Sequence, residues 1–192
     1  MNASSFIKVD KATFFKIAAA HSDERLEYVR GRIMQQMTGA TRRHSPVADR
    51  IARLLEDRIG PGLVVVRERG IDTPETVRYA DVVVEPVNGS EGSLATKRAV
   101  IIVEVLSPTP GERDIGIKSV EYGTFESVVT YIVAGQDEAA CLVWTRDNSQ
   151  HFSSEPTDVI SFYSSIDIPG LSLTLPRGEI YRGIVAAPET KD

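Results

Sequence analysis

The sequence predicts one mixed α/β domain, in which a central mixed sheet is flanked by helices and preceded by an N-terminal helix and β-hairpin. Two observations predict this class. The chain has 192 residues, of which 42% are hydrophobic and 26% charged, as is typical of a soluble globular domain. Segments with helical and strand patterns alternate along it. We expect residues 1–185 to form the domain and residues 186–192 to be a polar tail.

Three segments carry helix signals. In residues 10–20, Asp10 can cap the first turn of a helix. Ser45 offers an N-cap hydroxyl ahead of Pro46, and apolar residues then recur at helical spacing up to Ile59. Residues 113–122 form the third predicted helix.

The predicted strands are rich in β-branched residues and are separated by Gly, Pro, Ser and Thr. They cover residues 26–29, 32–37, 63–69, 77–85, 99–106, 128–133 and 140–146, with short segments near 151–152, 159–163 and 171–175. Gly31 separates the first two strands, which predicts a tight hairpin.

Charge and cysteine content exclude several classes of protein. The chain has 22 basic and 27 acidic residues, and the net charge of −5 argues against a broad electrostatic grip on DNA. Cys141 is the single cysteine, which rules out an intrachain disulfide and a thiolate zinc site. The single cysteine also favours a reducing, cytoplasmic setting. We expect no membrane association, because the longest aliphatic run, residues 99–103, is too short to cross a bilayer.

Two acidic residues interrupt segments that otherwise have strand composition. Asp81 lies within residues 77–84 and Glu104 within residues 99–106. A carboxylate on the apolar face of a strand is costly unless it is paired, hydrogen-bonded or bound to a metal. If the loop at 88–93 makes these strands an antiparallel hairpin, the two acids lie about opposite each other, with Cβ atoms ~5 Å apart. Such a pair favours a cation between the carboxylates, and oxygen ligands favour Mg²⁺ or Mn²⁺.

Lys118 is the cation expected to complete this site. Asp114, Lys118 and Tyr122 are spaced by four residues, so they share one face of a helix. The turn at 107–111 can fold that face back over the two acids. Two ordinary alternatives remain open: a strand acid that points to solvent or pairs with Arg78, and an exposed Asp114–Lys118 ion pair.

These residues resemble the Uma-two family, a bacterial group of restriction-endonuclease-like proteins within the PD-(D/E)XK nuclease superfamily. The similarity covers most of the chain. Its most specific part is Glu-Val-Leu-Ser-Pro at 104–108, followed by Asp114 and Lys118. Further matches lie at residues 26–33, His44, 78–84, Tyr122, 127–133 and 168–173.

The resemblance implies a restriction-endonuclease-like core in which Asp81 and Glu104 are metal ligands. The wider superfamily has a lysine two residues after the second acid, where this chain has Leu106, and the resemblance suggests Lys118 as its replacement. Position 80 is alanine where the family motif has proline. Glu27 matches an acidic position ahead of the glycine turn, so it is a weaker candidate for a third metal-binding carboxylate, with a surface acid as the alternative.

The remaining candidates concern the substrate. Arg42, Arg43 and His44 precede a helix N-terminus, a place where phosphate binds readily. Arg43 and His44 are therefore weaker substrate-binding candidates, together with Asp114 and Tyr122. A solvated run of charges is the alternative for the basic residues.

Two classes of function follow. The first is an endonuclease-like hydrolase that cleaves phosphodiester bonds in DNA with Mg²⁺ or Mn²⁺, using Asp81, Glu104 and Lys118. The second is a catalytically silent protein of nuclease fold, either a nucleic-acid-binding protein or a regulatory homodimer whose acids pair with arginines. In both classes we expect weak or transient binding of nucleic acid, DNA being favoured, and a homo-oligomer, most simply a dimer.

Overall fold

A mixed sheet of nine strands runs through the part of the chain that the computed structural model describes, residues 8–35, 42–89, 92–106, 112–147, 149–159 and 163–185. Its main path is β2 (Arg32–Gln35), β1 (Leu26–Val29), β4 (Thr76–Pro86), β6 (Ile101–Leu106), β7 (Thr130–Gly135), β8 (Cys141–Thr145) and β9 (Thr157–Val159). Off this path, β3 (Leu63–Asp72) pairs with β4 and with β5 (Ala95–Thr96). The pairs β6–β7 and β3–β5 are parallel and the others antiparallel, which makes the sheet mixed as predicted.

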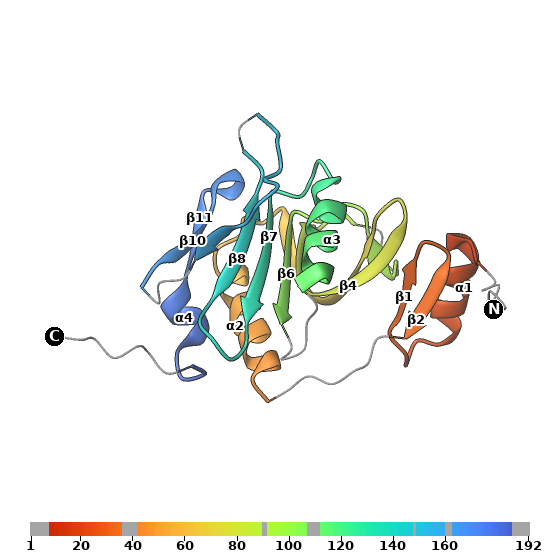
Figure 1. The fold of residues 1–192 in the computed structure, drawn as a ribbon, viewed down its shortest axis with the longest axis horizontal. Coiled ribbons are helices and arrows are strands. Elements are labelled where there is room, and N and C mark those ends of the chain that lie inside the picture. Colours follow the sequence, from red (N-terminus) through yellow and green to blue (C-terminus); the bar gives the residue numbers. More distant parts are fainter. Residues whose placement is uncertain are drawn as a thin grey trace.

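Helices cover both faces of this sheet (Figure 1). The helices in the described ranges are α1 (Lys11–Ala20), α2 (His44–Glu56), α3 (Glu112–Gly123) and α4 (Arg177–Tyr181). Successive residues of a strand point to opposite faces. Val103 of β6 accordingly packs in the core beneath α2, whereas its neighbour Ile102 packs in the core that holds Tyr122 of α3. Strand β6 therefore lies between the two helices that reach the candidate site.

The ends of the sheet are closed by smaller units (Figure 1). The hairpin β1–β2 lies at one end with α1, and Phe14 of α1 is buried against Tyr28 and Val77. At the other end, β10 (Ser165–Ile168) and β11 (Leu173–Pro176) form a separate antiparallel pair, linked by a 3₁₀ turn at Pro169–Leu171 and followed by α4. None of the helices in the described ranges combines the length and apolar character needed to cross a membrane.

Most predicted elements are confirmed. Asp10 caps α1 by accepting a hydrogen bond from the backbone N–H of Thr13 at 2.7 Å, and the hairpin turns at Arg30 and Gly31, both with positive φ. The predicted cap at Ser45 is wrong: α2 begins at His44, two residues before the predicted first position at Pro46, with Arg43 at the cap position and no side-chain cap. The short strand expected near 151–152 is an isolated bridge between Arg146 and Phe152.

Three elements were not predicted, β5, β10 and α4. Each has five residues or fewer, so local periodicity is too weak to indicate it. The polar tail predicted at 186–192 and the loop at 107–111 lie outside the described residues.

Candidate active site

The strand pairing brings the two predicted acids face to face. Strands β4 and β6 are antiparallel, and Val82 pairs with Val103, Val83 with Ile102 and Val84 with Ile101. The next position in the same register places Asp81 opposite Glu104. The antiparallel arrangement predicted from the sequence is therefore confirmed, and the acids are cross-strand neighbours.

Helix α3 supplies two partners to Glu104. The ammonium group of Lys118 donates to Oε2 of Glu104 at 2.6 Å, and the Tyr122 hydroxyl donates to Oε1 at 3.0 Å. Because Lys118 and Tyr122 are four residues apart, both lie on the helix face that packs over β6. The predicted approach of Lys118 to the acids is present, as an ion pair in which both side chains are nearly buried.

The surroundings of Glu104 oppose its ionisation. Burial raises the pKa of its carboxyl group, the charge of Asp81 acts in the same direction, and Lys118 and the Tyr122 hydroxyl offset part of the rise. Burial beside this carboxylate also raises the pKa of Tyr122 well above its usual value, so Tyr122 stays a neutral hydrogen-bond donor. A carboxyl group held in this way gains from any further cation brought next to it.

Asp81 has one partner on β6 and one on α2. Its Oδ2 accepts a hydrogen bond from the backbone N–H of Val105 at 2.7 Å. The Nε2 atom of His44, at the start of α2, lies 3.4 Å from the same oxygen. His44 was a weak substrate-binding candidate from the sequence. The structure instead places it against the first acid of the pair.

His44 is expected to titrate above its ordinary pKa of 6.5 in the metal-free protein. The hydrogen bond to Asp81 is the largest cause and stabilises the protonated imidazole, while burial acts against it. Because the folded pKa is the higher one, the stability from this contact is fully present below pH 6.5 and is lost as the pH rises through the folded pKa. An NMR titration of the His44 ring measures this directly. Asp81→Asn should lower the His44 pKa, and a value at or below 6.5 in the unsubstituted protein would contradict the assignment.

The donor set of the acid pair suits a hard divalent cation. Asp81 and Glu104 offer carboxylate oxygens from adjacent strands, and Oδ1 of Asp81 makes no hydrogen bond to the described residues. Within the described ranges, no group of three or more His, Cys, Asp and Glu side chains is placed to hold a metal ion. Two carboxylates with water completing the shell is a common arrangement for Mg²⁺. The residues present therefore fit Mg²⁺ or Mn²⁺.

Glu27 lies in a separate charged network that includes Arg78. Its Oε1 accepts a hydrogen bond from the backbone N–H of Tyr79 at 3.1 Å, and its Oε2 lies 3.9 Å from Nη1 of Arg78. The Nε atom of Arg78 in turn donates to Glu121 of α3 at 2.9 Å. This network joins β1, β4 and α3. Both carboxylate oxygens of Glu27 therefore contact β4. No observation tests metal binding by Glu27, so that role stays a prediction.

The other predicted residues are more scattered. Arg43 is exposed and donates to Asp137 at 3.1 Å, in the turn between β7 and β8. Asp114 lies in the first turn of α3, but its side chain is outside the described part of the structure. Sequence reasoning missed the contact of His44 with Asp81 and the Arg78 network. The spacing of four between Lys118 and Tyr122 was the signal that could have identified Tyr122 as a partner of Glu104.

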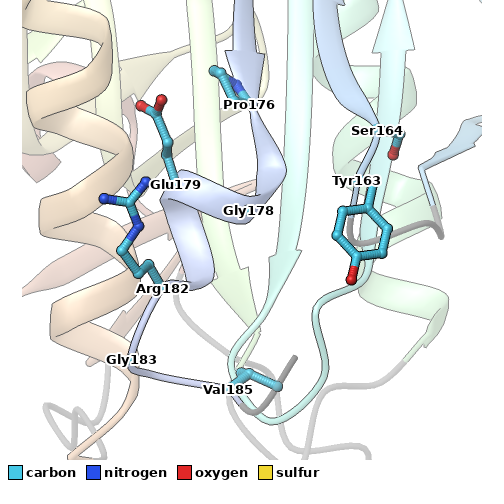
Figure 2. A pocket seen from close by; sticks show the side chains of 8 residues that line it. All are labelled: Tyr163, Ser164, Pro176, Gly178, Glu179, Arg182, Gly183 and Val185. Carbon is cyan, nitrogen blue, oxygen red and sulfur yellow. The ribbon is translucent and has the colours of Figure 1, made fainter. Parts of the chain in front are cut away.

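A hollow of about 460 Å³ lies elsewhere, beside α4. Figure 2 shows Tyr163 on one side of it and Glu179 and Arg182 on the other. Glu179 lies 3.4 Å from Arg58, which follows α2 in the chain. None of its lining residues belongs to the acid pair or its partners, so this hollow is not part of the candidate active site.

The fold is that of a nuclease-like protein. A crystal structure described as a putative nuclease from Anabaena variabilis ATCC 29413 matches with a TM-score of 0.66 and 14% sequence identity, over 83% of this chain and 90% of that one. The chain itself belongs to the Uma2 family, the Uma-two family introduced above, whose model is described as a putative restriction endonuclease and matches residues 12–176. No curated protein matches the chain.

Proposed function

We propose that this chain is a metal-dependent nuclease of the PD-(D/E)XK type, which hydrolyses phosphodiester bonds in DNA. The observation that carries the proposal is the cross-strand pair of Asp81 and Glu104, with Lys118 on the second acid at 2.6 Å. Membership of a family described as a putative restriction endonuclease agrees with it.

Each residue has a definite part in this function. Asp81 and Glu104 would hold Mg²⁺ or Mn²⁺, which when bound polarises the phosphate and makes a bound water more acidic. Lys118 takes the place of the lysine that the wider superfamily has where this chain has Leu106, and its ammonium group stabilises the negative charge that develops on the phosphate. Tyr122 and the backbone N–H of Val105 hold the two carboxylates in position.

Purified protein is expected to nick supercoiled plasmid DNA when Mg²⁺ or Mn²⁺ is present and to lose this activity with EDTA. Asp81→Asn should abolish both cleavage and calorimetric binding of Mn²⁺, because it halves the charge of the ligand pair. Asp167→Asn removes an exposed acid of β10, in the separate two-stranded pair, and is the matched control. No cleavage of any DNA, together with Mn²⁺ binding unchanged in Asp81→Asn, would overturn the proposal.

A catalytically silent protein of the same fold is the second candidate. It is favoured by the fact that each acid already has a partner within the chain, Lys118 for Glu104 and His44 for Asp81. Nucleic-acid binding that needs no metal and survives Glu104→Ala, with no cleavage by the unsubstituted protein, would support this candidate. Loss of cleavage in the acid variants supports the nuclease instead.

A further inference from the structure

Two neighbouring hollows, of about 560 and 380 Å³, share Asp72 and Lys97, and residues 94–98 line the larger one while residues 72–74 and 124–125 line the smaller one. Helix α1 lines both with one face, because Lys11, Phe15 and Ala19 are four residues apart. We call the two hollows together the basic groove.

The basic side chains that line the groove outnumber the carboxylates that pair with them. Asp72 is the one acid among the described residues that line it. This carboxylate is nearly buried, and it is shared by the ammonium groups of Lys11, in close contact, and Lys97, at 3.4 Å. Two ammonium groups and one carboxylate have a net charge of +1. Lys97, whose side chain is 74% exposed, carries it at the rim.

Two arginines add to this excess. Arg98 is exposed next to Lys97, and its Nη1 donates at 3.1 Å to the side-chain oxygen of Asn88, which is neutral. Arg69 lies deeper and pairs with Glu85 at 3.2 Å. The four cations of the groove thus face two carboxylates, which leaves two positive charges on a chain whose net charge is −5. Such a local excess attracts a polyanion that the whole chain would repel.

Each hollow also has an aromatic wall. Phe15 of α1 lines the larger one and Phe125 lines the smaller one, and both rings are partly buried. Unpaired bases stack on such rings, whereas paired bases in a duplex do not expose their faces. The hollow volumes lie in the range of about 300–1,000 Å³ that holds small ligands, so they have room for single nucleotides and not for a duplex.

We propose that the basic groove binds a segment of single-stranded nucleic acid, with phosphates at Lys97 and Arg98 and bases against Phe15 and Phe125. This inference rests on the proposed nuclease function, since the strand would be part of the substrate. Helix α3 connects the two places: Lys118 and Tyr122 contact Glu104, and the chain that follows the helix carries Thr124 and Phe125 into the groove. The substrate class is then DNA with an unpaired segment.

Binding of fluorescein-labelled oligo-dT, measured by fluorescence anisotropy in EDTA, tests the groove without metal or cleavage. The double variant Lys97→Gln/Arg98→Gln should weaken binding about tenfold and reduce the slope of log K against log salt by about 1.4, roughly 0.7 for each lost phosphate contact. Both side chains are exposed and Asp72 keeps its contact with Lys11, so we expect the fold to be retained, as circular dichroism would show. Arg53→Gln/Arg182→Gln removes the same charge from exposed positions on α2 and after α4, and it should bind as the unsubstituted protein does.

The ligand itself supplies the second arm of the experiment. An oligomer of abasic sites keeps every phosphate and loses every base, so it should bind at least about fivefold more weakly than oligo-dT. A fully paired duplex should also bind more weakly. Equal loss in both double variants, or a duplex that binds as tightly as oligo-dT, would overturn the proposal.

Failure of the groove and failure of the nuclease are distinguishable. Asp81→Asn should keep its affinity for oligo-dT in EDTA and lose cleavage. If no DNA is cut but binding of oligo-dT still depends on Lys97 and Arg98, the groove proposal holds and the nuclease proposal is wrong. If DNA is cut and the KM for single-stranded substrate is unchanged in Lys97→Gln/Arg98→Gln, the groove fails and the nuclease stands.

Discussion

Glu104→Gln is expected to reduce DNA cleavage by at least about 10³-fold while the protein remains folded. The amide keeps the shape of the side chain and can still accept a hydrogen bond from Tyr122, but it removes the negative charge needed to hold a divalent cation. Burial raises the pKa of Glu104, so its charge costs folding free energy. Glutamine removes that cost, which stabilises the fold, and also removes the ion pair to Lys118, which destabilises it. The two effects on the free energy of unfolding therefore act in opposite directions.

Initial rates of plasmid nicking with Mg²⁺, measured beside circular dichroism spectra, check this result. Glu75→Gln is the matched control, because Glu75 is an exposed acid paired with Arg30 on the surface. Its rate should equal that of the unsubstituted protein. Cleavage by a folded Glu104→Gln variant within about tenfold of the normal rate would remove Glu104 from the metal site.

Arg78→Met is expected to lower the free energy of unfolding by about 3 kcal/mol. This is the largest loss of stability that we expect from a single substitution in an ion pair of this protein. Arg78 is nearly buried between Glu121 and Glu27, and Thr76 also donates to Glu121 at 3.1 Å. Without the guanidinium group, two nearly buried carboxylates face each other with no arginine between them. Chemical denaturation with urea measures the loss.

Arg30→Met provides the comparison for this prediction. Arg30 pairs with Glu75 at 2.8 Å, but the side chains are 68% and 64% exposed, so the loss should stay below about 1 kcal/mol. The double variant Arg78→Met/Glu121→Gln should recover part of the stability, because it removes one of the two uncompensated charges. Equal losses in Arg78→Met and Arg30→Met would show that the Arg78 network adds nothing beyond a surface pair.

The acid pair was predictable because strand geometry is regular. Side chains alternate along a strand, and the pairing register of a hairpin follows from the position of its loop. A hairpin centred near Gly92 places Asp81 opposite Glu104, and the observed register agrees, although β5 lies between the two strands in the sequence and pairs with β3. Helix geometry is equally regular, so the spacing of four residues placed Lys118 and Tyr122 on one face of α3, where both contact Glu104.

His44 shows where such reasoning stops. It directly precedes Ser45, and the sequence indicated a helix start near it and a weak substrate-binding role, but no contact with Asp81. Its contact with Asp81 depends on how α2 packs against the sheet, over a separation that no local pattern encodes. Arg78 is similar: the sequence offered it as a partner for a strand acid, and it pairs instead with Glu121 and Glu27 on two other elements.

By itself, the sequence determined the class of fold, most of its helices and strands, and the two carboxylates with their lysine. These features follow from backbone periods and short-range spacing, which are properties of the chain alone. The tertiary structure decided which groups surround those carboxylates and where the basic groove lies. Lys11 and Lys97 are far apart in the sequence and meet at Asp72 only because α1 packs beside the β3–β5 edge. Packing over such separations depends on the whole core, so only the folded chain shows a local positive surface on a protein whose net charge is −5.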